Sequence, residues 1–309
     1  MDMFSALLED FHTRAPELEL REYEPMERHT SFRVGGPARL MVLPRTEGQA
    51  RWALSLASAR GISPFFLGNG TNLLVSDRGY PGLVVKLAGQ LNQERVTAIR
   101  EENRRLIAGA GVLLSQLANA AWGRNLTGLE FAQGIPGTVG GGVVMNAGAY
   151  GGELCQVLAS VTALEPDGTR RVFPAAECHF GYRKSRFSDG RRLILEAAFA
   201  LEPGDEHTIK ARMEDLAARR REKQPLEYPS AGSTFKRPQG YFAAALIEDC
   251  GLKGASVGGA QVSEKHAGFV INRGGATAED ILRLMDHVRE TVQRQTGVTL
   301  EPEVKLLGF

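Results

Sequence analysis

Residues 64–86 read PFFLGNGTNLLVSDRGYPGLVVK, in which a glycine-rich loop separates two apolar runs. Both runs are short and rich in branched or aromatic residues, so each predicts a β-strand. A further strand is predicted at 39–43 and an amphipathic helix at 46–61. Strand, helix and strand in this order form a β-α-β unit, whose ligands bind beyond the carboxyl ends of the strands. The loop that begins at Gly68 therefore occupies a position that favours ligand binding.

The loop GNGTN, residues 68–72, has a composition suited to binding a diphosphate. Its glycines allow backbone N–H groups to converge on an anion without any basic side chain. It is not a P-loop, because no Gly-Lys-Ser/Thr follows, and it is not a GxGxxG motif, because the third glycine is absent. The alternative interpretation is an ordinary turn. The candidate cofactor-binding residues of this loop are Gly68, Asn69, Gly70, Thr71 and Asn72.

A second glycine-rich segment, GIPGTVGGGVVMNAG, covers residues 134–148. By itself it is more typical of a tight turn that leads into a buried helix, but it could also enclose the rest of a large planar cofactor. Two such segments in one chain favour a large phosphate-bearing ligand. The candidate cofactor-binding residues of this segment are Gly137, Thr138, Gly140, Gly141 and Asn146.

The composition is that of a folded protein without a strong net charge. Of its 309 residues, 43% are hydrophobic, and 37 basic residues against 36 acidic ones give a net charge of +1. This balance provides no field that would attract nucleic acid or an anionic membrane. No apolar stretch reaches the ~18 residues of a membrane span, and the first residues do not form a secretion signal. We therefore expect neither a nucleic-acid partner nor a membrane partner.

Cysteine and histidine usage argues against two further kinds of site. The 3 cysteines are widely spaced and contain no CxxC pair, which argues against a disulfide framework and a zinc site. The 6 histidines show no metal-ligand spacing, so no metal site is predicted. A reducing compartment, and hence the cytoplasm, is expected.

Three later motifs contain candidate catalytic residues. In FGYRKSRF, Arg183 lies among aromatic residues and could bind a carboxylate, although a lone arginine is more often a surface ion-pair partner. In PSAGSTFKRP, Ser233 follows Gly232 and is either a turn residue or a proton donor; no G-x-S-x-G elbow supports a hydrolase nucleophile. In LEPEVKLLG, Glu301 or Glu303 could orient a catalytic partner or be solvated.

The order of the remaining elements predicts an α+β fold. A helix is expected at 113–122, strands dominate 160–201, and a charged helix follows at 206–223. Near the end, Thr277 is expected to cap a helix whose apolar residues form one face. Strands and helices are thus mixed in lobes, with no internal repeat.

Seven motifs, taken in order, resemble the bacterial UDP-N-acetylenolpyruvoylglucosamine reductase family along residues 29–308: HTSFRVGG, GNGTNLLV, GIPGTVGG, NAGAYGGE, GYRKSRF, AGSTFKRP and LEPEV. The resemblance implies an α+β protein with a two-lobed FAD-binding domain of the vanillyl-alcohol-oxidase type. The lobes are expected at 1–88 and 89–203, and a C-terminal α+β substrate-binding domain at 204–309. The last strand of that domain would return Glu303 to the active site.

The resemblance also implies a reaction in two halves, which forms UDP-N-acetylmuramate for peptidoglycan synthesis and so serves cell-wall growth, cell shape and division. NADPH gives a hydride to N5 of a non-covalent FAD, and the enolpyruvyl UDP-sugar then receives that hydride. By similarity, Arg183 and Glu303 stabilise the enol-like intermediate and Ser233 delivers the proton.

For the substrate, the resemblance places Lys223 at the UDP diphosphate, with Tyr150 and Arg237 near matching positions. Other members of the family can carry Asn in place of Arg237. The chain resembles a shorter subtype that lacks a tyrosine-bearing insertion, and a monomer is expected. Two rival interpretations are another FAD-dependent oxidoreductase of the same fold and a nucleotide-binding module without catalysis. A covalent flavin would favour the first, and the absence of a reducible flavin the second.

Overall fold

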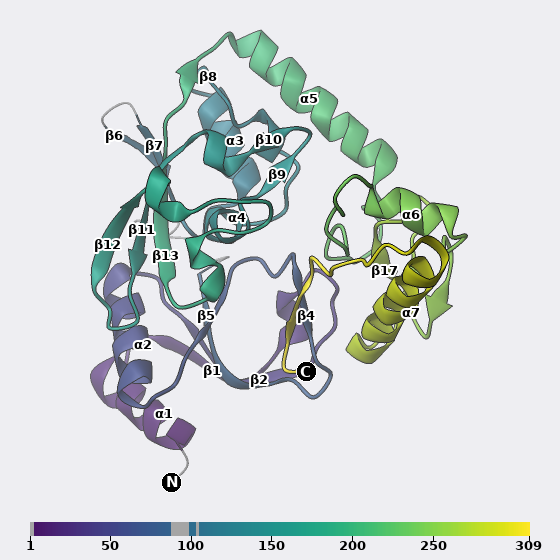
Figure 1. Ribbon diagram of the computed structural model, residues 1–309. Helices are drawn as coiled ribbons and strands as arrows, with labels where there is room; N and C mark the ends of the chain where they lie inside the picture. The colour runs from purple at the N-terminus through teal and green to yellow at the C-terminus, as the bar shows by residue number, and fades with distance from the viewer. Residues whose placement is uncertain (1–2, 88–98, 103–104) are drawn as a thin grey trace. The chain divides into compact units, whose positions relative to one another are not determined.

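The computed structural model describes residues 3–87, 99–102 and 105–309 (Figure 1). The expected boundary between the first two lobes, at 88 and 89, lies outside the described residues. The chain contains both helices and strands, and most of its sheets are antiparallel, which confirms the α+β class. The chain forms two compact units: the first contains Met1–Glu22, Leu40–Asn69 and Gly82–Ala218, and the second contains Tyr23–Arg39, Gly70–Pro81 and Arg219–Phe309.

A five-stranded antiparallel sheet forms much of the first unit, in the order β12-β11-β13-β7-β6. All seven residues of the central strand β13 are buried, including the acidic Glu196. Its carboxylate receives Arg100 from β6 at 2.9 Å and Arg170 from β12 at 3.2 Å, because an unpaired buried charge would cost several kcal/mol. The strands are β6 (Ile99–Glu102), β7 (Arg105–Gly109), β11 (Leu158–Leu164), β12 (Arg170–Pro174) and β13 (Leu193–Phe199).

The strands and helix predicted around the opening sequence are present, but their pairing differs from a simple β-α-β unit. The sheet order is β1-β2-β5-β3, so β5 lies between the two strands that the helix α2 connects. In α2, the side chain of Thr46 accepts a hydrogen bond from the backbone N–H of Gln49 at 3.1 Å. The elements are α1 (Met3–Arg14), β1 (Glu19–Pro25), β2 (Pro37–Leu43), α2 (Glu47–Ala59), β3 (Phe65–Leu67) and β5 (Tyr80–Lys86).

The remaining elements of the first unit carry the second glycine segment and the turns near it. The helix α4 begins directly after Thr138, so the segment leads into a helix. The charged helix predicted at 206–223 is confirmed as α5, which continues into the second unit. The elements are α3 (Leu114–Trp122), β8 (Leu126–Thr127), α4 (Val139–Met145), β9 (Gly148–Ala149), β10 (Gly152–Glu153), β14 (Glu202–Pro203) and α5 (Glu206–Lys223).

The second unit contains a small antiparallel sheet, β15-β16-β17, and the long helix α7. Thr277 caps α7, as predicted, and its side chain accepts a hydrogen bond from the Asp280 N–H at 3.0 Å. The predicted apolar face of α7 is at most 1% exposed and consists of Ile281, Leu284, Met285, Val288 and Val292. The elements are α6 (Ala243–Asp249), β15 (Ser256–Val257), β16 (Ala260–Val262), β17 (Val270–Asn272) and α7 (Ala278–Thr296).

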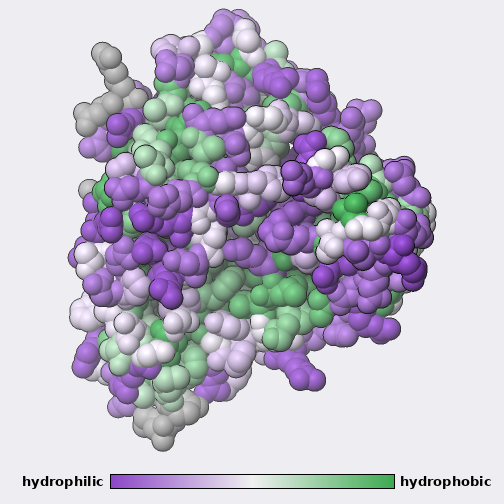
Figure 2. All heavy atoms as spheres, in the orientation of Figure 1, coloured by the Kyte–Doolittle hydropathy of each residue, from purple (hydrophilic) through white to green (hydrophobic). Residues whose placement is uncertain are grey.

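A parallel pair of strands in the second unit was not expected from the sequence. Strand β4 (Leu73–Val75) lies inside what was interpreted as loop, and it pairs with β18 (Lys305–Leu307) at the C-terminus. Because the two strands are so far apart in the sequence, no local pattern indicates that they pair, and β4 was therefore missed. No helix in the described part of the chain is long and apolar enough to cross a membrane. Hydrophilic side chains cover most of the face drawn in Figure 2.

Candidate active site

Two glycine-rich segments of the first unit are in direct contact. The side-chain amide of Asn69 donates a hydrogen bond to the carbonyl of Pro136 at 2.8 Å. A Cβ placed on Gly68 would lie 2.5 Å from Oγ1 of Thr138, closer than real contacts allow. The fold therefore brings together the start of the GNGTN loop and the GIPGT turn, although about 70 residues separate them.

The two segments differ in how they use their backbone N–H groups. Among the residues that the structure describes, none accepts a hydrogen bond from the N–H groups of residues 68–71. In the second segment, by contrast, Val139 donates to the carbonyl of Val112 at 2.8 Å and Gly140 to that of Ala110 at 2.9 Å. The N–H of Gly141 points to Oγ1 of Thr138 at 3.4 Å. Among the described residues, N–H groups without an acceptor therefore remain at 68–71 and, in the second segment, at Gly137 and Thr138.

In the second unit, the motif HTSFRVGG supports the GNGTN loop at Gly70. This glycine has a φ of +62°, and a Cβ there would lie 1.9 Å from the carbonyl oxygen of His29. The N–H of Ser31 donates to the carbonyl of Gly70 at 3.0 Å. The ring of His29 is in turn held by Glu24, with 2.8 Å between Nε2 and Oε1. Gly70 is therefore required by close packing against the backbone.

Asn146 is buried, and its side chain organises the turns around it. Its Nδ2 donates to Oε2 of Glu153 at 2.8 Å and to the carbonyl of Gly181 at 3.3 Å, while its Oδ1 accepts from the N–H of Cys155 at 3.0 Å. The residue adopts φ +44°, a left-handed conformation that Asn tolerates well. Burial raises the pKa of the Cys155 thiol, and the Asn146 hydrogen bond partly opposes that shift.

Arg183 occupies a strained position in a tight turn. Gly181 and Lys184 exchange both backbone hydrogen bonds, so Tyr182 and Arg183 form the tip. Arg183 has φ +55°, where glycine is preferred, and such strain costs roughly 1–3 kcal/mol. Its Nη2 donates to the carbonyl of Gly148 at 3.2 Å, and its guanidinium lies 5.3 Å from the Tyr182 ring centroid. The fold thus retains a large cation where a glycine would be easier to place.

Tyr150 shows the same pattern in a neighbouring segment. It lies with Gly151 in the two-residue turn between β9 and β10, and both residues have positive φ, +54° and +87°. A β-hairpin turn of this kind prefers Asn or Gly at both positions. The Tyr150 side chain nevertheless occupies one of them and is 40% exposed. A strained, exposed aromatic residue is a reasonable position for a ligand contact.

The fold pairs the segments that contain the two other candidate catalytic residues. Lys236 N–H donates to the carbonyl of Glu301, and Glu303 N–H donates to the carbonyl of Thr234, each at 2.8 Å. Ser233 precedes this pairing, follows Gly232 at φ +77°, and is exposed. Ser233 is therefore accessible just before the segment that pairs with residues 301–303.

The same pairing places the two C-terminal glutamates in different environments. Glu301 is exposed and forms an ion pair with Lys236. Glu303 is half-buried, and its backbone is held on both sides: Asn72 donates through Nδ2 to the Glu303 carbonyl at 3.0 Å. This arrangement favours Glu303 over Glu301 as the carboxylate of the site.

The candidate substrate residues of the second unit are exposed cations. Lys223 lies in the last turn of α5, and Arg237 stacks on Phe242 with 3.9 Å from its guanidinium carbon to the ring centroid. The pKa of nearby His266 is lowered, chiefly by burial and also by the positive charges of Lys253 and Lys223. His266 also accepts a hydrogen bond at Nδ1 from the N–H of Gly268 at 3.1 Å.

Asp77 was not selected from the sequence, yet it connects distant parts of the second unit. Its two carboxylate oxygens accept hydrogen bonds from the backbone N–H groups of Ala278 at 2.8 Å and Glu279 at 3.0 Å. These are the first residues of α7, where unpaired N–H groups favour an anion. Asp77 lies two residues after β4, so it joins the chain that follows the GNGTN loop to the start of α7. Its partners lie too far along the chain for any local signal.

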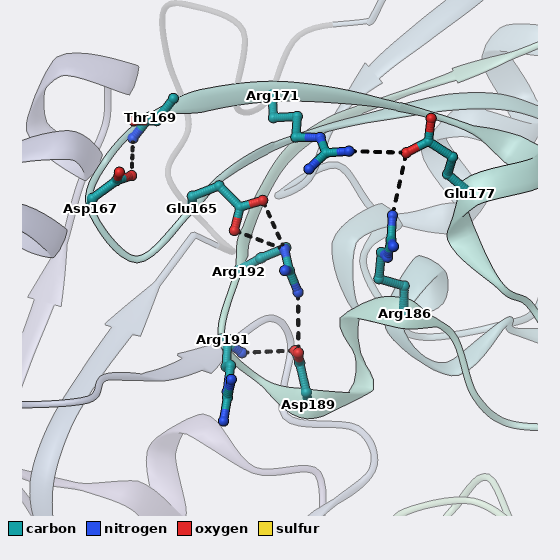
Figure 3. Close-up of polar contacts among 9 residues, drawn as sticks. All are labelled: Glu165, Asp167, Thr169, Arg171, Glu177, Arg186, Asp189, Arg191 and Arg192. Atoms are coloured by element: carbon teal, nitrogen blue, oxygen red, sulfur yellow. Dashed lines mark hydrogen bonds and ion pairs between the residues drawn. The ribbon is translucent and has the colours of Figure 1, made fainter.

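A charged network lies on the first unit around the turn between β11 and β12 (Figure 3). Arg192 pairs with Glu165 at 2.9 Å and with Asp189 at 3.1 Å, and Glu177 receives Arg171 at 3.2 Å and Arg186 at 3.4 Å. A shallow hollow of about 640 Å³ adjoins this turn and is lined by residues 165–167 and 169–171. Glu165, Glu177 and Asp189 are each paired with arginines, and the hollow contains none of the candidate residues. We therefore regard it as a surface ion-pair network.

Two family models match parts of this chain. Residues 224–307 match the family model described as UDP-N-acetylenolpyruvoylglucosamine reductase, C-terminal domain, and residues 38–173 match that described as FAD binding domain. A relative in Clostridium botulinum named UDP-N-acetylenolpyruvoylglucosamine reductase is 50% identical over 285 residues, which cover 92% of this chain and 91% of that protein. A relative of the same name in Caldanaerobacter subterraneus is 48% identical, with 92% of each chain covered.

A solved structure extends the likeness to the fold. The crystal structure of UDP-N-acetylenolpyruvylglucosamine reductase from Thermus caldophilus is 34% identical and matches with a TM-score of 0.78, covering 94% of this chain and 98% of that one. Identity at this level over almost the whole length is sufficient to assign a family. This chain belongs to the UDP-N-acetylenolpyruvoylglucosamine reductase family.

Proposed function

We propose that this protein reduces the enolpyruvyl group of UDP-N-acetylenolpyruvoylglucosamine to give UDP-N-acetylmuramate, with FAD as cofactor and NADPH as reductant. The proposal rests on the family membership and on the arrangement of candidate residues described above. When bound, FAD would accept a hydride from NADPH and supply it to the substrate double bond. The side chains of the protein would bind and orient the cofactor and the substrate, and would protonate the reduced substrate.

The residues of the GNGTN loop fit a cofactor with a diphosphate. Four consecutive N–H groups, at residues 68–71, have no acceptor among the described residues, and such a row suits phosphate oxygens. The loop contains no carboxylate that would repel an anion. Thr138 and Pro136 pack against its first residues and would support the cofactor from the neighbouring segment. Asn146 would contribute by fixing the turns near it.

The proposed catalytic roles follow from the chemistry of three side chains. Arg183 would hold the substrate carboxylate and the negative charge that develops next to it, since guanidinium and carboxylate form charge-assisted hydrogen bonds. Glu303 would polarise the same intermediate. Ser233 would donate the proton that completes the reduction, and such positioned transfer contributes typically ~10²–10⁴ in rate. Tyr150, Lys223 and Arg237 would bind the UDP-sugar, with Lys223 at the diphosphate.

One observation carries the proposal: the hydrogen-bonded pairing of residues 234–236 with 301–303, next to Asn72. Hydrogen bonds thereby join the segment after Ser233 to the backbone of Glu303, and the backbone of Glu303 to the end of the GNGTN loop. A nucleotide-binding module without catalysis would not need a proton donor and a carboxylate beside its cofactor loop. A different flavin oxidoreductase would need a different acceptor, which the test below would reveal.

The test is the visible absorption of the FAD-loaded protein without oxygen, before NADPH, after NADPH, and after the enolpyruvyl UDP-sugar. NADPH should bleach the flavin bands, and only the sugar should restore them. Ser233→Ala should keep the bleaching and slow the recovery by about 10²-fold or more. A flavin that bleaches but ignores the sugar would overturn the substrate assignment, and loss of both steps in Ser233→Ala would overturn the role of the hydroxyl.

The proposal also includes a cytoplasmic, monomeric enzyme with segments 1–88, 89–203 and 204–309 as two FAD lobes and a substrate domain. Comparing NADPH with NADH in the bleaching step measures the reductant preference directly. Light scattering of the FAD-loaded protein would determine its oligomeric state.

A further inference from the structure

The side chain of Asn72 is used in a way that diphosphate binding does not explain. Its Nδ2 donates to the backbone carbonyl of Glu303 at 3.0 Å. Its backbone carbonyl accepts from the N–H of Lys305 at 3.1 Å, at the start of the parallel pairing between β4 and β18. Asn72 therefore holds the chain immediately before and after Val304.

Glu303 is fixed from its other side by the segment after Ser233. Its N–H donates to the carbonyl of Thr234 at 2.8 Å. Thr234 is itself rigid, because it is buried and its Oγ1 accepts a hydrogen bond from the N–H of Val270 at 3.0 Å. Both polar backbone groups of Glu303 are thus occupied, one by the cofactor loop and one by the Ser233 segment. The backbone from which the Glu303 carboxylate extends is therefore held on two sides.

We propose that Asn72 is a positioning residue for Glu303, which makes the placement of this carboxylate depend on the conformation of the GNGTN loop. The inference rests on the proposed function, since it assigns Asn72 to the half-reaction in which Glu303 acts. The amide side chain suits this role because it adds one hydrogen bond between the two chains just before the first residues of β4 and β18. An alanine would leave the Glu303 carbonyl without this donor, and the carboxylate would move.

The test separates the two half-reactions of the FAD-loaded enzyme by stopped-flow absorbance. Because Asn72 belongs to the candidate cofactor loop, the rates of the two half-reactions of Asn72→Ala are compared as a ratio: a change in flavin binding should slow both steps, whereas a displaced Glu303 should slow only the step in which Glu303 acts. Recovery with the enolpyruvyl UDP-sugar should slow roughly 10- to 100-fold, the loss expected when a catalytic group shifts by a fraction of an ångström to 1 Å. In the Glu303→Gln background, Asn72→Ala should have no further effect, because both changes act through one carboxylate.

Gln293→Ala is the control. It removes a hydrogen bond of the same kind, from the side-chain amide Nε2 of Gln293 to the carbonyl of Gly297 at 3.3 Å, at the C-terminal end of α7 within the same unit. It should lower thermal stability and leave the ratio of the two half-reaction rates unchanged. If Asn72→Ala does not retain FAD, Asn72→Ser provides the same test, because its hydroxyl is too short to reach the carbonyl.

Additive losses in the double variant, equal slowing of both half-reactions, or the same split in Gln293→Ala would each overturn the positioning role. Failure of the proposed function would look different, because the wild-type flavin itself would then not recover with the sugar.

Discussion

The two glycine-rich segments look alike in sequence but perform different tasks in the fold. In residues 68–71, the backbone N–H groups have no acceptor among the described residues, and Gly70 presses against the backbone of His29. In residues 139–141, the N–H groups are used by Val112, Ala110 and Thr138. The helical part of the second segment thus has no spare donors, whereas its turn keeps the N–H groups of Gly137 and Thr138 without an acceptor among the described residues and contacts the first segment through Pro136 and Thr138.

The difference shows that glycine content alone does not identify an anion site. Glycines serve one segment by permitting a positive φ, and the other by allowing close packing of a helix. Gly142, for example, lies where a Cβ would be 2.9 Å from the side chain of Leu154. What distinguishes the two is the destination of the backbone hydrogen bonds, which only the folded structure reveals.

Gly70→Ala should have the largest effect, a loss of about 3 kcal/mol or more in the stability of the apoprotein together with loss of FAD binding. The reasons are the φ of +62° and the 1.9 Å approach to the His29 carbonyl oxygen. Thermal unfolding with and without FAD measures both. A stable variant with normal FAD affinity would show that Gly70 is not under the constraint described here.

Asn69→Ala should have an intermediate effect, because it removes the hydrogen bond that joins the two segments. One such bond contributes about 1 kcal/mol, so FAD affinity should fall roughly fivefold. Fluorescence titration of FAD measures the dissociation constant. Arg45→Ala, which removes an exposed ion pair with Glu19 elsewhere in the first unit, is the control and should leave that constant unchanged. An equal loss in both variants would argue against a specific link between the segments.

Gly141→Ala should act in the opposite direction and stabilise the apoprotein by about 0.5–1 kcal/mol, since Ala favours a helix over Gly. Gly141 lies in α4 with ordinary φ, and a Cβ there would have only a normal contact, 3.5 Å from Oγ1 of Thr138. Gly140→Ala is the matched comparison, because its Cβ would lie 3.0 Å from that of Ala110. Destabilisation by Gly141→Ala would mean that the second segment is also conformationally constrained.

The smallest expected effect is the dependence of stability on pH. Neither glycine-rich segment contains a titratable side chain, so this dependence comes from elsewhere. The folded-state pKa of His266 is lowered, so the unfolded chain binds more protons just below the unperturbed value of about 6.5. Stability should therefore fall as pH drops through that window. His266→Asn, whose Oδ1 can still accept from Gly268, should flatten this dependence relative to wild type. Identical pH profiles of thermal unfolding between pH 7 and 5 would exclude His266 as the cause.

Much of the secondary structure could be predicted because its signals are local. Thr46 and Thr277 cap the helices they were expected to cap, and the apolar face of α7 is buried as its spacing indicates. Strand β4 was missed because its partner is the C-terminal strand. The choice between Glu301 and Glu303 had no physical basis in the sequence, since the two carboxylates differ only in what the fold places beside them.

By itself, the sequence determined the α+β class, the positions of the glycine segments and the residue types available for chemistry. Periodicity, caps and turn residues act over a few positions, so they can be recognised in one dimension. The tertiary structure alone decided which N–H groups remain open at 68–71, that Arg183 and Tyr150 stand at strained turn tips, and that Asn72 and Thr234 hold Glu303. These features depend on hydrogen bonds between segments far apart in the chain, and such partners are chosen by packing rather than by neighbouring residues.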